Sequence, residues 1–587
     1  MYRYSDFDRR FIRQRAAQFR DQLRRHLAGQ LSADDFRPLR LQNGWYVQRH
    51  APMLRVAIPY GELSSRQLRT LARVAREFDR VTDGPWAGQG GFGHFTTRQN
   101  IQFNWIPLAC AADVMDVLAE ADLHGIQTSG NCIRNITTDA LAGIAPDEIV
   151  DPRPYCELLR QWSTLHPEFA FLPRKFKIAV TGAADDRAAI AWHDIGLQLR
   201  RDPHGAVGFR VLAGGGMGRT PLVAPELRAF VPWQDIVLYL EAILRVYNLF
   251  GRRDNLYKAR LKILVKAEGQ RFVDAVEAEY RALRDDDALG AQLRLTPAAL
   301  AKVQAHFTPP PGWVDEAAPA APSTPSPAAA APTEAAAALP PAYRRWRERH
   351  VQAHRLPGLC AVTLTLKRAG QPPGNASADQ LDAAADLADR FSAGEARVSH
   401  EQNLLLPWVR EADLPALWQA ARAVGLGASH RGLLTDLIAC PGGDLCSLAN
   451  ARTLPIAAAV LERYQDPDEL EAIGELALHI SGCMNSCGHH HSGHIGILGV
   501  DKDGSEWYQL TLGGSDGQMR HGPARAGRVV GPAFAADEIV DALDAVVATY
   551  LEQRAPDERF LDTLTRLGLE PFRTATDAVR HTTAVPA

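Results

Sequence analysis

HFTTRQNIQFNWI, at residues 94–106, decides the fold prediction, because RVSHEQNLLLPWV, at residues 397–409, repeats its pattern 303 positions later. The two stretches share a Gln-Asn pair in the middle and a tryptophan near the end. Arg98 aligns with Glu401, so only the first copy keeps a basic residue at this position.

The flanking sequence repeats as well. A predicted strand (53–59) and an amphipathic helix (64–79) precede the first stretch, and a strand (360–367) and a helix (376–391) precede the second. A strand, helix, strand, helix unit that recurs once predicts two half-domains that pair about a pseudo-twofold axis, since one copy alone leaves a sheet edge open. The alternative is a chance likeness between two common α/β units.

Length and composition limit the class of protein. The chain has 587 residues, 46% of them hydrophobic and 23% charged, which indicates several globular domains. A net charge of −3 gives no general reason to bind nucleic acid or an anionic membrane. The start of the chain does not have the pattern of an export signal, and the sequence has no apolar run long enough to span a bilayer, so we expect a cytoplasmic protein. Residues 1–25 have arginines around an apolar stripe of Ile12, Ala16, Phe19 and Leu23, which is typical of a packed amphipathic helix.

Four of the eight cysteines form a pattern. Cys440 and Cys446 have five residues between them, and Cys483 and Cys487, which have three, follow after 36 residues. Thiolates select zinc, copper(I) or iron–sulfur clusters. Structural zinc sites favour two-residue gaps, whereas wider gaps and nearby glycines suit a bulkier cubane cluster. Zinc and unconnected core cysteines remain as alternatives.

The pattern CxxxxxC followed by GCxxxCGxxxxxxIG, together with the upstream repeat, resembles the sirohaem and [4Fe-4S] sulfite and nitrite reductases. The resemblance covers nearly the whole chain, with Met484 where many members have proline. It implies an α+β fold of duplicated ferredoxin-like half-domains plus two larger α/β domains for the sirohaem and the cluster. It also implies that Cys440, Cys446, Cys483 and Cys487 hold the cluster and that Cys487 bridges to the sirohaem iron.

The resemblance also gives a role to basic residues that would otherwise be taken for surface residues. Arg98, Arg134, Lys175 and Lys177 match the family's two arginines and two lysines over the distal face of the sirohaem. A buried site for a small oxyanion needs cations to offset desolvation, and ammonium groups can also give up protons. Because side chains alternate along a strand, Lys175 and Lys177 are predicted to share a face.

Two further stretches contain residues of types that bind cofactors or metals. GGGMGRT at 214–220 lacks the last glycine of a dinucleotide fingerprint, and by resemblance it is the family's glycine-rich loop, where Arg219 pairs with a sirohaem carboxylate. The histidines at 489–491 and His494 indicate either a metal site or hydrogen bonds close to the cluster.

Domain boundaries follow from these observations and from a Pro- and Ala-rich segment at 308–342 that is predicted to be an extended linker. We expect a helical extension (1–50), half-domain 1 (51–126), a sirohaem and substrate domain (127–307), the linker (308–342), half-domain 2 (343–428) and a cluster domain (429–587).

The resemblance implies an assimilatory sulfite reductase that passes electrons through the cluster to sirohaem. The double lysine of RKFK at 174–177 favours sulfite, because nitrite reductases of the family tend to have asparagine in place of the second lysine. The alternatives are a ferredoxin-type nitrite reductase and a non-enzymatic zinc-binding scaffold. With no flavin or nicotinamide domain apparent, electrons are expected from a separate ferredoxin or flavoprotein subunit, for which the basic amino-terminal helix is a possible docking site.

Overall fold

The computed structural model describes residues 1–164, 166–313 and 340–580. Its residues form two compact units. Unit 1 comprises Met1–Gly216, Leu222–Leu364 and Ala376–Gly427, and unit 2 comprises Met217–Pro221, Thr365–Asn375 and Ala428–Ala587. Most of the predicted linker, residues 314–339, lies outside the described residues, and the predicted domain boundaries stay predictions.

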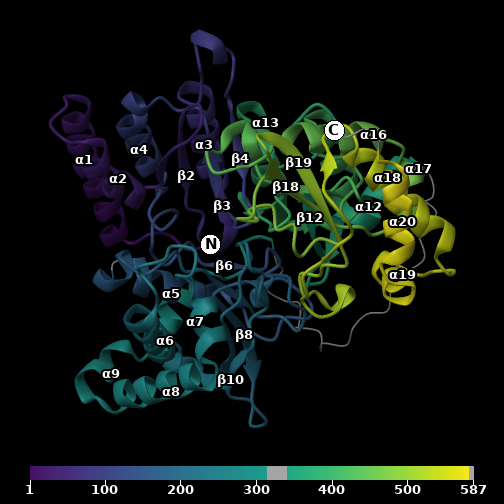
Figure 1. The fold of residues 1–587 in the computed structure, drawn as a ribbon. Coiled ribbons are helices and arrows are strands. Elements are labelled where there is room, and N and C mark those ends of the chain that lie inside the picture. Colours follow the sequence, from purple (N-terminus) through teal and green to yellow (C-terminus); the bar gives the residue numbers. More distant parts are fainter. Residues whose placement is uncertain (165, 314–339, 581–587) are drawn as a thin grey trace. The chain divides into compact units, whose positions relative to one another are not determined.

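The two predicted half-domains are present as two five-stranded sheets with helices (Figure 1). The first sheet has the order β1 (Trp45–Val47), β2 (Pro52–Val56), β5 (Ile101–Phe103), β4 (Phe92–Phe95) and β13 (Asn375–Ser377), with helices α3 (Ser65–Glu77) and α4 (Ala111–Glu120). The second has the order β11 (Val351–Ala353), β12 (Leu359–Leu364), β15 (Leu404–Arg410), β14 (Glu395–Val398) and β3 (Glu62–Ser64), with helices α12 (Pro341–His350), α13 (Ala378–Phe391) and α14 (Leu414–Ala423).

The half-domains exchange strands. β3 comes from the first half of the chain but pairs antiparallel with β14, and β13 comes from the second half but joins β4. Each sheet therefore has one edge covered by a strand of the other half-domain, which explains why the unit occurs twice.

Equivalent contacts across the pair confirm the pseudo-twofold axis. The Gln99 Nε2 donates to the Val398 carbonyl at 2.9 Å, and the Gln402 Nε2 donates to the Phe95 carbonyl at 2.9 Å. Both glutamines have positive φ, 54° and 60°. Donors and acceptors are related by the same shift of 303 residues that the sequence shows.

Helices α3 and α13 pack against each other and begin in the same way. Ser64 with Gln67 and Ser377 with Gln380 each form a capping box, in which the serine and the glutamine satisfy free backbone donors of the first turn. Ion pairs then cross between the helices, from Arg69 to Asp386 and from Arg76 to Asp379 and Asp382.

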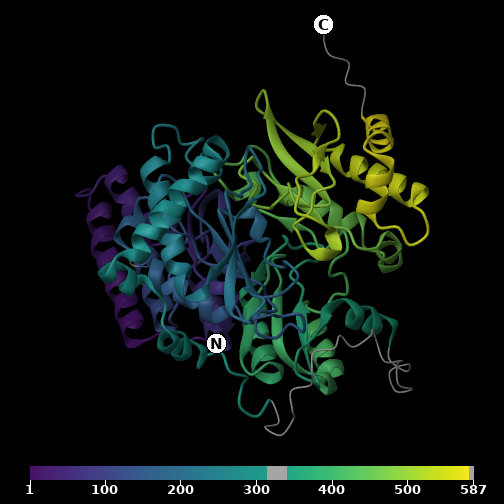
Figure 2. The same cartoon turned by 90° about the horizontal axis from the view of Figure 1, so that it is seen from below.

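The larger domain of unit 1 is a mixed sheet with helices (Figure 2). The strand order is β10 (Glu226–Pro232), β9 (Val207–Ala213), β8 (Ile195–Arg201), β7 (Ile178–Thr181) and β6 (Thr137–Thr138), and β6, β7 and β8 are parallel. Its helices are α5 (Arg153–Thr164), α6 (Ile236–Phe250), α7 (Leu261–Glu268), α8 (Gln270–Asp285), α9 (Asp287–Leu293) and α10 (Pro297–Gln304). One hydrophobic core joins α5, α6 and α8 to β7, β8 and β9.

Unit 2 contains a second mixed sheet. Its order is β16 (Ile438–Ala439), β17 (Leu478–Ser481), β18 (Ile495–Lys502), β19 (Ser505–Leu512) and β20 (Arg528–Val529), with β21 (Phe534–Ala535) also paired to β19. β18 and β19 form the predicted hairpin, in which Lys502 pairs with Ser505. Its helices are α15 (Gly442–Leu445), α16 (Leu454–Arg463), α17 (Pro467–Ile473), α18 (Ile539–Gln553), α19 (Phe560–Leu567) and α20 (Glu570–Ala578).

The larger domains are also copies of one another, which the sequence analysis did not detect. In both, two parallel pairings are followed by an antiparallel one: β6, β7, β8, β9 in unit 1 and β16, β17, β18, β19 in unit 2. The registers agree, because Ile178 pairs with Ile195 and Leu478 pairs with Ile495, each 300 residues later. The short Ile-Gly signatures at 195–196 and 495–496 are the sequence trace of this repeat.

The amino-terminal residues form α1 (Asp6–Leu27) and α2 (Ala33–Gln42). The predicted stripe of Ile12, Ala16, Phe19 and Leu23 is buried, which confirms a packed helix. Arg9 pairs with Asp122, and Arg20 pairs with two aspartates of α4, so part of the basic face is engaged within unit 1. No helix in the described ranges is long and apolar enough to cross a membrane.

Candidate active site

The four patterned cysteines follow two neighbouring parallel strands of unit 2. Cys440 comes directly after β16, and Cys483 lies two residues after β17. The Cys440 backbone N–H donates to the Ile480 carbonyl at 3.2 Å, and the Gly482 N–H donates to the Cys440 Sγ at 3.3 Å. Because carboxyl ends of parallel strands share one edge of a sheet, the fold brings the two cysteine pairs together.

Close backbone packing makes room for this arrangement. Gly442 has a φ of +56°, and a Cβ on Gly482 would lie 2.7 Å from the Gly442 Cα and 2.6 Å from the Ala451 carbonyl oxygen. The backbones that carry the two cysteine pairs therefore approach more closely than side chains would allow.

The thiols differ in burial and influence one another. Cys440 and Cys483 are buried, Cys446 is half-buried and Cys487 is exposed. Burial, followed by the nearby thiol of Cys487, raises the pKa of Cys440 to about 12, and burial with Cys487 and Cys446 also raises the pKa of Cys483. Such thiols ionise readily only when a metal takes the place of the proton.

The predicted basic residues lie in unit 1. Arg98 is buried, and its guanidinium donates to the Thr137 Oγ1 at 3.0 Å and to the Asn135 carbonyl at 2.6 Å. Burial lowers its pKa to about 9, with Asp194 opposing the shift and Arg134 and Arg260 adding to it. Arg134 donates to the carbonyls of Thr128 and Gly130 at 2.8 and 2.7 Å.

Lys175 and Lys177 are half-buried and flank Phe176, which is buried and forms a single bridge to Ile133. We predict from the sequence that both lysines lie on a strand, but the regular strand β7 begins only at Ile178, directly after Lys177. The alternation nevertheless holds, since Phe176 enters the core and the lysines do not.

Sequence reasoning missed an acidic residue that organises these cations. The Asp194 carboxylate accepts from the Lys177 backbone N–H at 2.9 Å and from the Arg260 guanidinium at 2.8 Å. Lys262 lies two residues after Arg260. Burial, followed by the repulsion of Arg260, lowers the pKa of Lys262 to about 8. Arg98 and Lys177 also act on the buried His193, whose pKa is depressed mainly by burial.

The two copies of the larger domain differ at equivalent positions. In unit 2 the Ala477 N–H donates to the His494 Nδ1 at 3.2 Å, as the Lys177 N–H donates to Asp194 in unit 1. Alanine thus replaces the lysine in the copy that has the cysteines. The predicted basic residues therefore lie in one copy and the patterned cysteines in the other.

The glycine loop (residues 214–221) belongs to both parts of the molecule. Met217–Pro221, with the exposed Arg219, is part of unit 2, although the residues on either side are part of unit 1. Within the described ranges, no group of three or more His, Cys, Asp or Glu side chains is arranged to hold a metal ion. This holds for the histidine run and for the four cysteines alike, so the cysteines lie near one another without forming a closed single-ion site.

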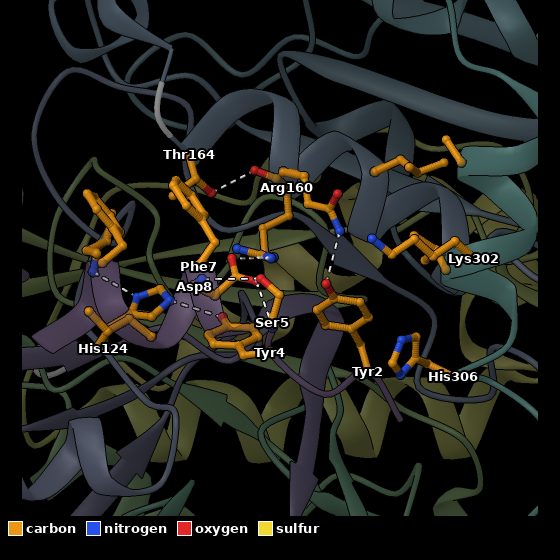
Figure 3. Close-up of a pocket in the computed structure, with 17 residues that line it drawn as sticks. Tyr2, Tyr4, Ser5, Phe7, Asp8, His124, Arg160, Thr164, Lys302 and His306 are labelled. Atoms are coloured by element: carbon orange, nitrogen blue, oxygen red, sulfur yellow. Dashed lines mark hydrogen bonds and ion pairs between the residues drawn. The ribbon is translucent and has the colours of Figure 1, made fainter.

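A separate cavity of about 360 Å³ lies in unit 1, between the amino-terminal segment and helix α5 (Figure 3). The Tyr4 hydroxyl is 3.0 Å from the His124 Nε2, and Arg160 pairs with Asp8 at 3.1 Å. None of the predicted site residues lines this cavity. The ion pair between Asp8 and Arg160 attaches the amino-terminal segment to α5.

Four cysteines behind parallel strands are a donor set for an iron–sulfur cluster in a redox protein. The model for the nitrite and sulphite reductase 4Fe-4S domain matches residues 129–282 and again 433–581, and the model for the ferredoxin-like half domain of these reductases matches 46–121 and 366–424. The chain belongs to the nitrite and sulphite reductase family and is an oxidoreductase. The double match also agrees with the duplication of both kinds of domain.

Individual relatives are similar to this chain along most of its length. Sulfite reductase [ferredoxin] 1 of Mycolicibacterium paratuberculosis is 28% identical over 89% of this chain and 83% of its own length. Ferredoxin–nitrite reductase of Leptolyngbya laminosa is 30% identical over 79% of this chain and 81% of its own. The solved structure of the Mycobacterium tuberculosis NirA protein superposes with a TM-score of 0.72 at 26% identity, covering 93% of this chain and 92% of that one.

Proposed function

We propose that this protein is a sulfite reductase that reduces sulfite to sulfide with six electrons, using sirohaem and a [4Fe-4S] cluster. The observation that carries the proposal is the placement of Cys440, Cys446, Cys483 and Cys487 behind two neighbouring parallel strands, in a domain that matches a 4Fe-4S family model. The sulfite reductases among the relatives and the lysine pair at 175 and 177 support sulfite as the substrate.

The donor set fits the cluster. Soft thiolates are the expected ligands for it, and the close approach of the Gly442 and Gly482 backbones brings together the two segments whose cysteines would hold it. Cys487, the exposed member, is the proposed bridge to the sirohaem, and Arg219 is the proposed partner of a sirohaem carboxylate. The bound cofactors supply electrons at low potential, one at a time.

The residues of unit 1 bind the anion and supply protons. Arg98 and Arg134 offer guanidinium donors to sulfite oxygens, and their fixed hydrogen bonds to backbone carbonyls hold them in place before the anion binds. The overall change, HSO₃⁻ + 6 e⁻ + 6 H⁺ → HS⁻ + 3 H₂O, removes three oxygens as water and consumes protons. Lys175 and Lys177 are the proposed proton donors, with Asp194 holding the Lys177 backbone.

The second candidate is a nitrite reductase, because the family and several relatives include nitrite-reducing enzymes. Steady-state kinetics of the purified holoprotein on both anions, with a reduced dye or ferredoxin as donor, decides between them. We expect a higher kcat/KM for sulfite, and a clearly higher kcat/KM for nitrite would replace the first proposal with the second.

A visible spectrum with metal analysis tests the cofactors. We expect tetrapyrrole absorption together with iron and acid-labile sulfide, whereas a colourless zinc protein would contradict the proposal. The electron donor is proposed to be ferredoxin, because the sulfite reductase of Mycolicibacterium paratuberculosis and the nitrite reductase of Leptolyngbya laminosa are both named as ferredoxin-dependent. The proposed place of action is the cytoplasm.

A further inference from the structure

The histidines of the cysteine segment (residues 481–494) differ in their surroundings. His490 is completely buried, and neither of its ring nitrogens has a hydrogen-bond partner among the described residues. The His491 ring lies beside it at an angle of 44°, with ring centroids 3.9 Å apart, and its Nε2 lies 3.0 Å from the carbonyl oxygen of Gly218 in the glycine loop. Because a carbonyl only accepts, the His491 Nε2 carries the proton and donates it.

The base of the glycine loop is closed within unit 1. Gly216 and Leu222 exchange two backbone hydrogen bonds, of 2.8 and 3.0 Å, and the Lys262 Nζ donates to the Gly216 carbonyl at 3.2 Å. Beyond this base the backbone turns sharply. Gly218 has a φ of 110°, a conformation that residues other than glycine rarely adopt.

The tip of the loop is held by the cysteine segment. The Ser486 hydroxyl contacts the Met217 sulfur at 3.6 Å, a weak bond, and His491 makes the stronger bond to Gly218, the residue before Arg219. Residues 190 and 191 are the equivalents of His490 and His491 in the first copy of the domain, and they are Ile190 and Ala191. The imidazole bond to the loop therefore has no counterpart in the copy without the cysteines.

We infer that His491 is a positioning residue that fixes the glycine loop, and with it Arg219, on the segment that contains Cys483 and Cys487. Arg219 is exposed, so its direction depends on the backbone that carries it. Holding the Gly218 carbonyl restricts the adjacent peptide and limits where the Arg219 guanidinium can reach. The pairing of Arg219 with a sirohaem carboxylate rests on the proposed function. The inference that His491 holds the loop in place does not.

Limited proteolysis of the holoprotein tests the inference. Proteolysis is faster where the chain opens locally, so the rate of tryptic cleavage after Arg219, measured by mass spectrometry, reports how firmly the loop is held. We expect His491→Leu to raise the rate roughly three- to tenfold, the effect of losing one hydrogen bond. His491→Gln keeps an N–H donor and should restore most of the protection. His490→Ile is the matched control, because it introduces the residue of the first copy and removes no bond to the loop.

Three results would overturn the inference: equal cleavage rates in the native and His491→Leu proteins, a His491→Gln protein as sensitive as His491→Leu, or an equal effect of His490→Ile. If His491→Leu does not fold, His491→Phe, which keeps an aromatic ring but has no N–H donor, takes its place, and an unchanged cleavage rate after Arg219 would again contradict the inference.

Sirohaem retention is the second readout. On dilution, His491→Leu should lose its tetrapyrrole absorption several-fold faster than His491→Gln. Faster cleavage with unchanged retention would overturn the link between the loop and the cofactor. Absence of tetrapyrrole from every variant would overturn the proposed function, while the cleavage rates would still decide the role of His491.

Discussion

Asp194 connects two segments that carry basic residues, because its carboxylate accepts from the Lys177 backbone N–H and from the Arg260 guanidinium. It lies directly before β8, and its partners Lys177 and Arg260 lie directly before β7 and before α7. A single buried carboxylate thus holds the Lys177 backbone and the Arg260 guanidinium in place.

Replacing Lys177 with alanine tests its proposed role as a proton donor. The side chain is removed while the backbone bond to Asp194 remains, so we expect kcat for sulfite to fall about 10²- to 10⁴-fold with the cofactors retained. Kinetics and the visible spectrum of the same preparation measure the two effects, and Lys266→Ala, an exposed position on α7, is the control. A colourless Lys177→Ala protein would instead assign this residue to cofactor binding.

His124 should make the amino-terminal segment sensitive to acid. Its Nδ1 accepts from the Ile126 N–H, so its Nε2 donates to Tyr4 (Figure 3). Burial, and then the charge of Arg160, lowers its pKa to about 3, although Asp8 opposes the shift. Between about pH 6.5 and 3 the unfolded chain binds a proton that the folded chain does not, so stability is complete above this range and falls as the pH decreases.

Thermal or urea unfolding as a function of pH measures this contribution. His124→Gln should flatten the acid side of the curve, by at most about 1.4 kcal/mol for each pH unit. The exposed His204 provides the control variant, His204→Gln. Identical pH profiles for the native and His124→Gln proteins would show that this histidine does not contribute.

At the scale of elements, the exchanged strand β3 depends on a buried ion network. Arg153 at the start of α5 binds Glu62 on β3 at 3.0 Å and Asp151 at 2.8 Å, and the side chains of Arg153 and Glu62 are each only 2% exposed. Arg397 on β14, the strand that pairs with β3, binds Glu395 at 2.8 Å. Carboxylates buried this deeply are stable only while their cations are present.

We therefore expect Arg153→Met to destabilise unit 1 by about 3–5 kcal/mol, since it leaves the buried Glu62 and the half-buried Asp151 with one partner fewer. Arg76→Met is the matched control, because it breaks exposed ion pairs between α3 and α13 and should cost no more than about 1 kcal/mol. Chemical unfolding of both variants measures the difference. Equal effects would mean that the network adds nothing beyond an ordinary surface pair.

At the scale of the whole molecule, strand exchange makes the two halves of the chain interdependent. A fragment of residues 1–313 lacks β13, and a fragment of 340–587 lacks β3, so each would expose a sheet edge. We expect the fragments to be poorly soluble when produced separately and to copurify when produced together, as measured with a tag on one fragment. Two fragments that are each soluble and folded alone would contradict this expectation.

Duplication also explains why the basic residues and the cysteines of the proposed enzyme lie in different domains. Each copy of the larger domain places residues behind parallel strands, and divergence has put cations in one and cysteines in the other. A site for an anion and a site for an iron–sulfur cluster need different side chains, since cations attract an anion and soft thiolates bind iron. Two copies of one framework can meet both needs where a single copy cannot.

The sequence by itself determined the half-domain repeat, the buried stripe of α1, the hairpin of β18 and β19, and the family, because spacing and hydrophobic periodicity are local properties of the chain. Only the tertiary structure revealed the strand exchange, the second repeat, the place of Asp194 and Arg260 beside Lys177, and the bond from His491 to Gly218. These depend on contacts between residues 17 to more than 300 positions apart, and no local pattern records which distant backbone a side chain will reach.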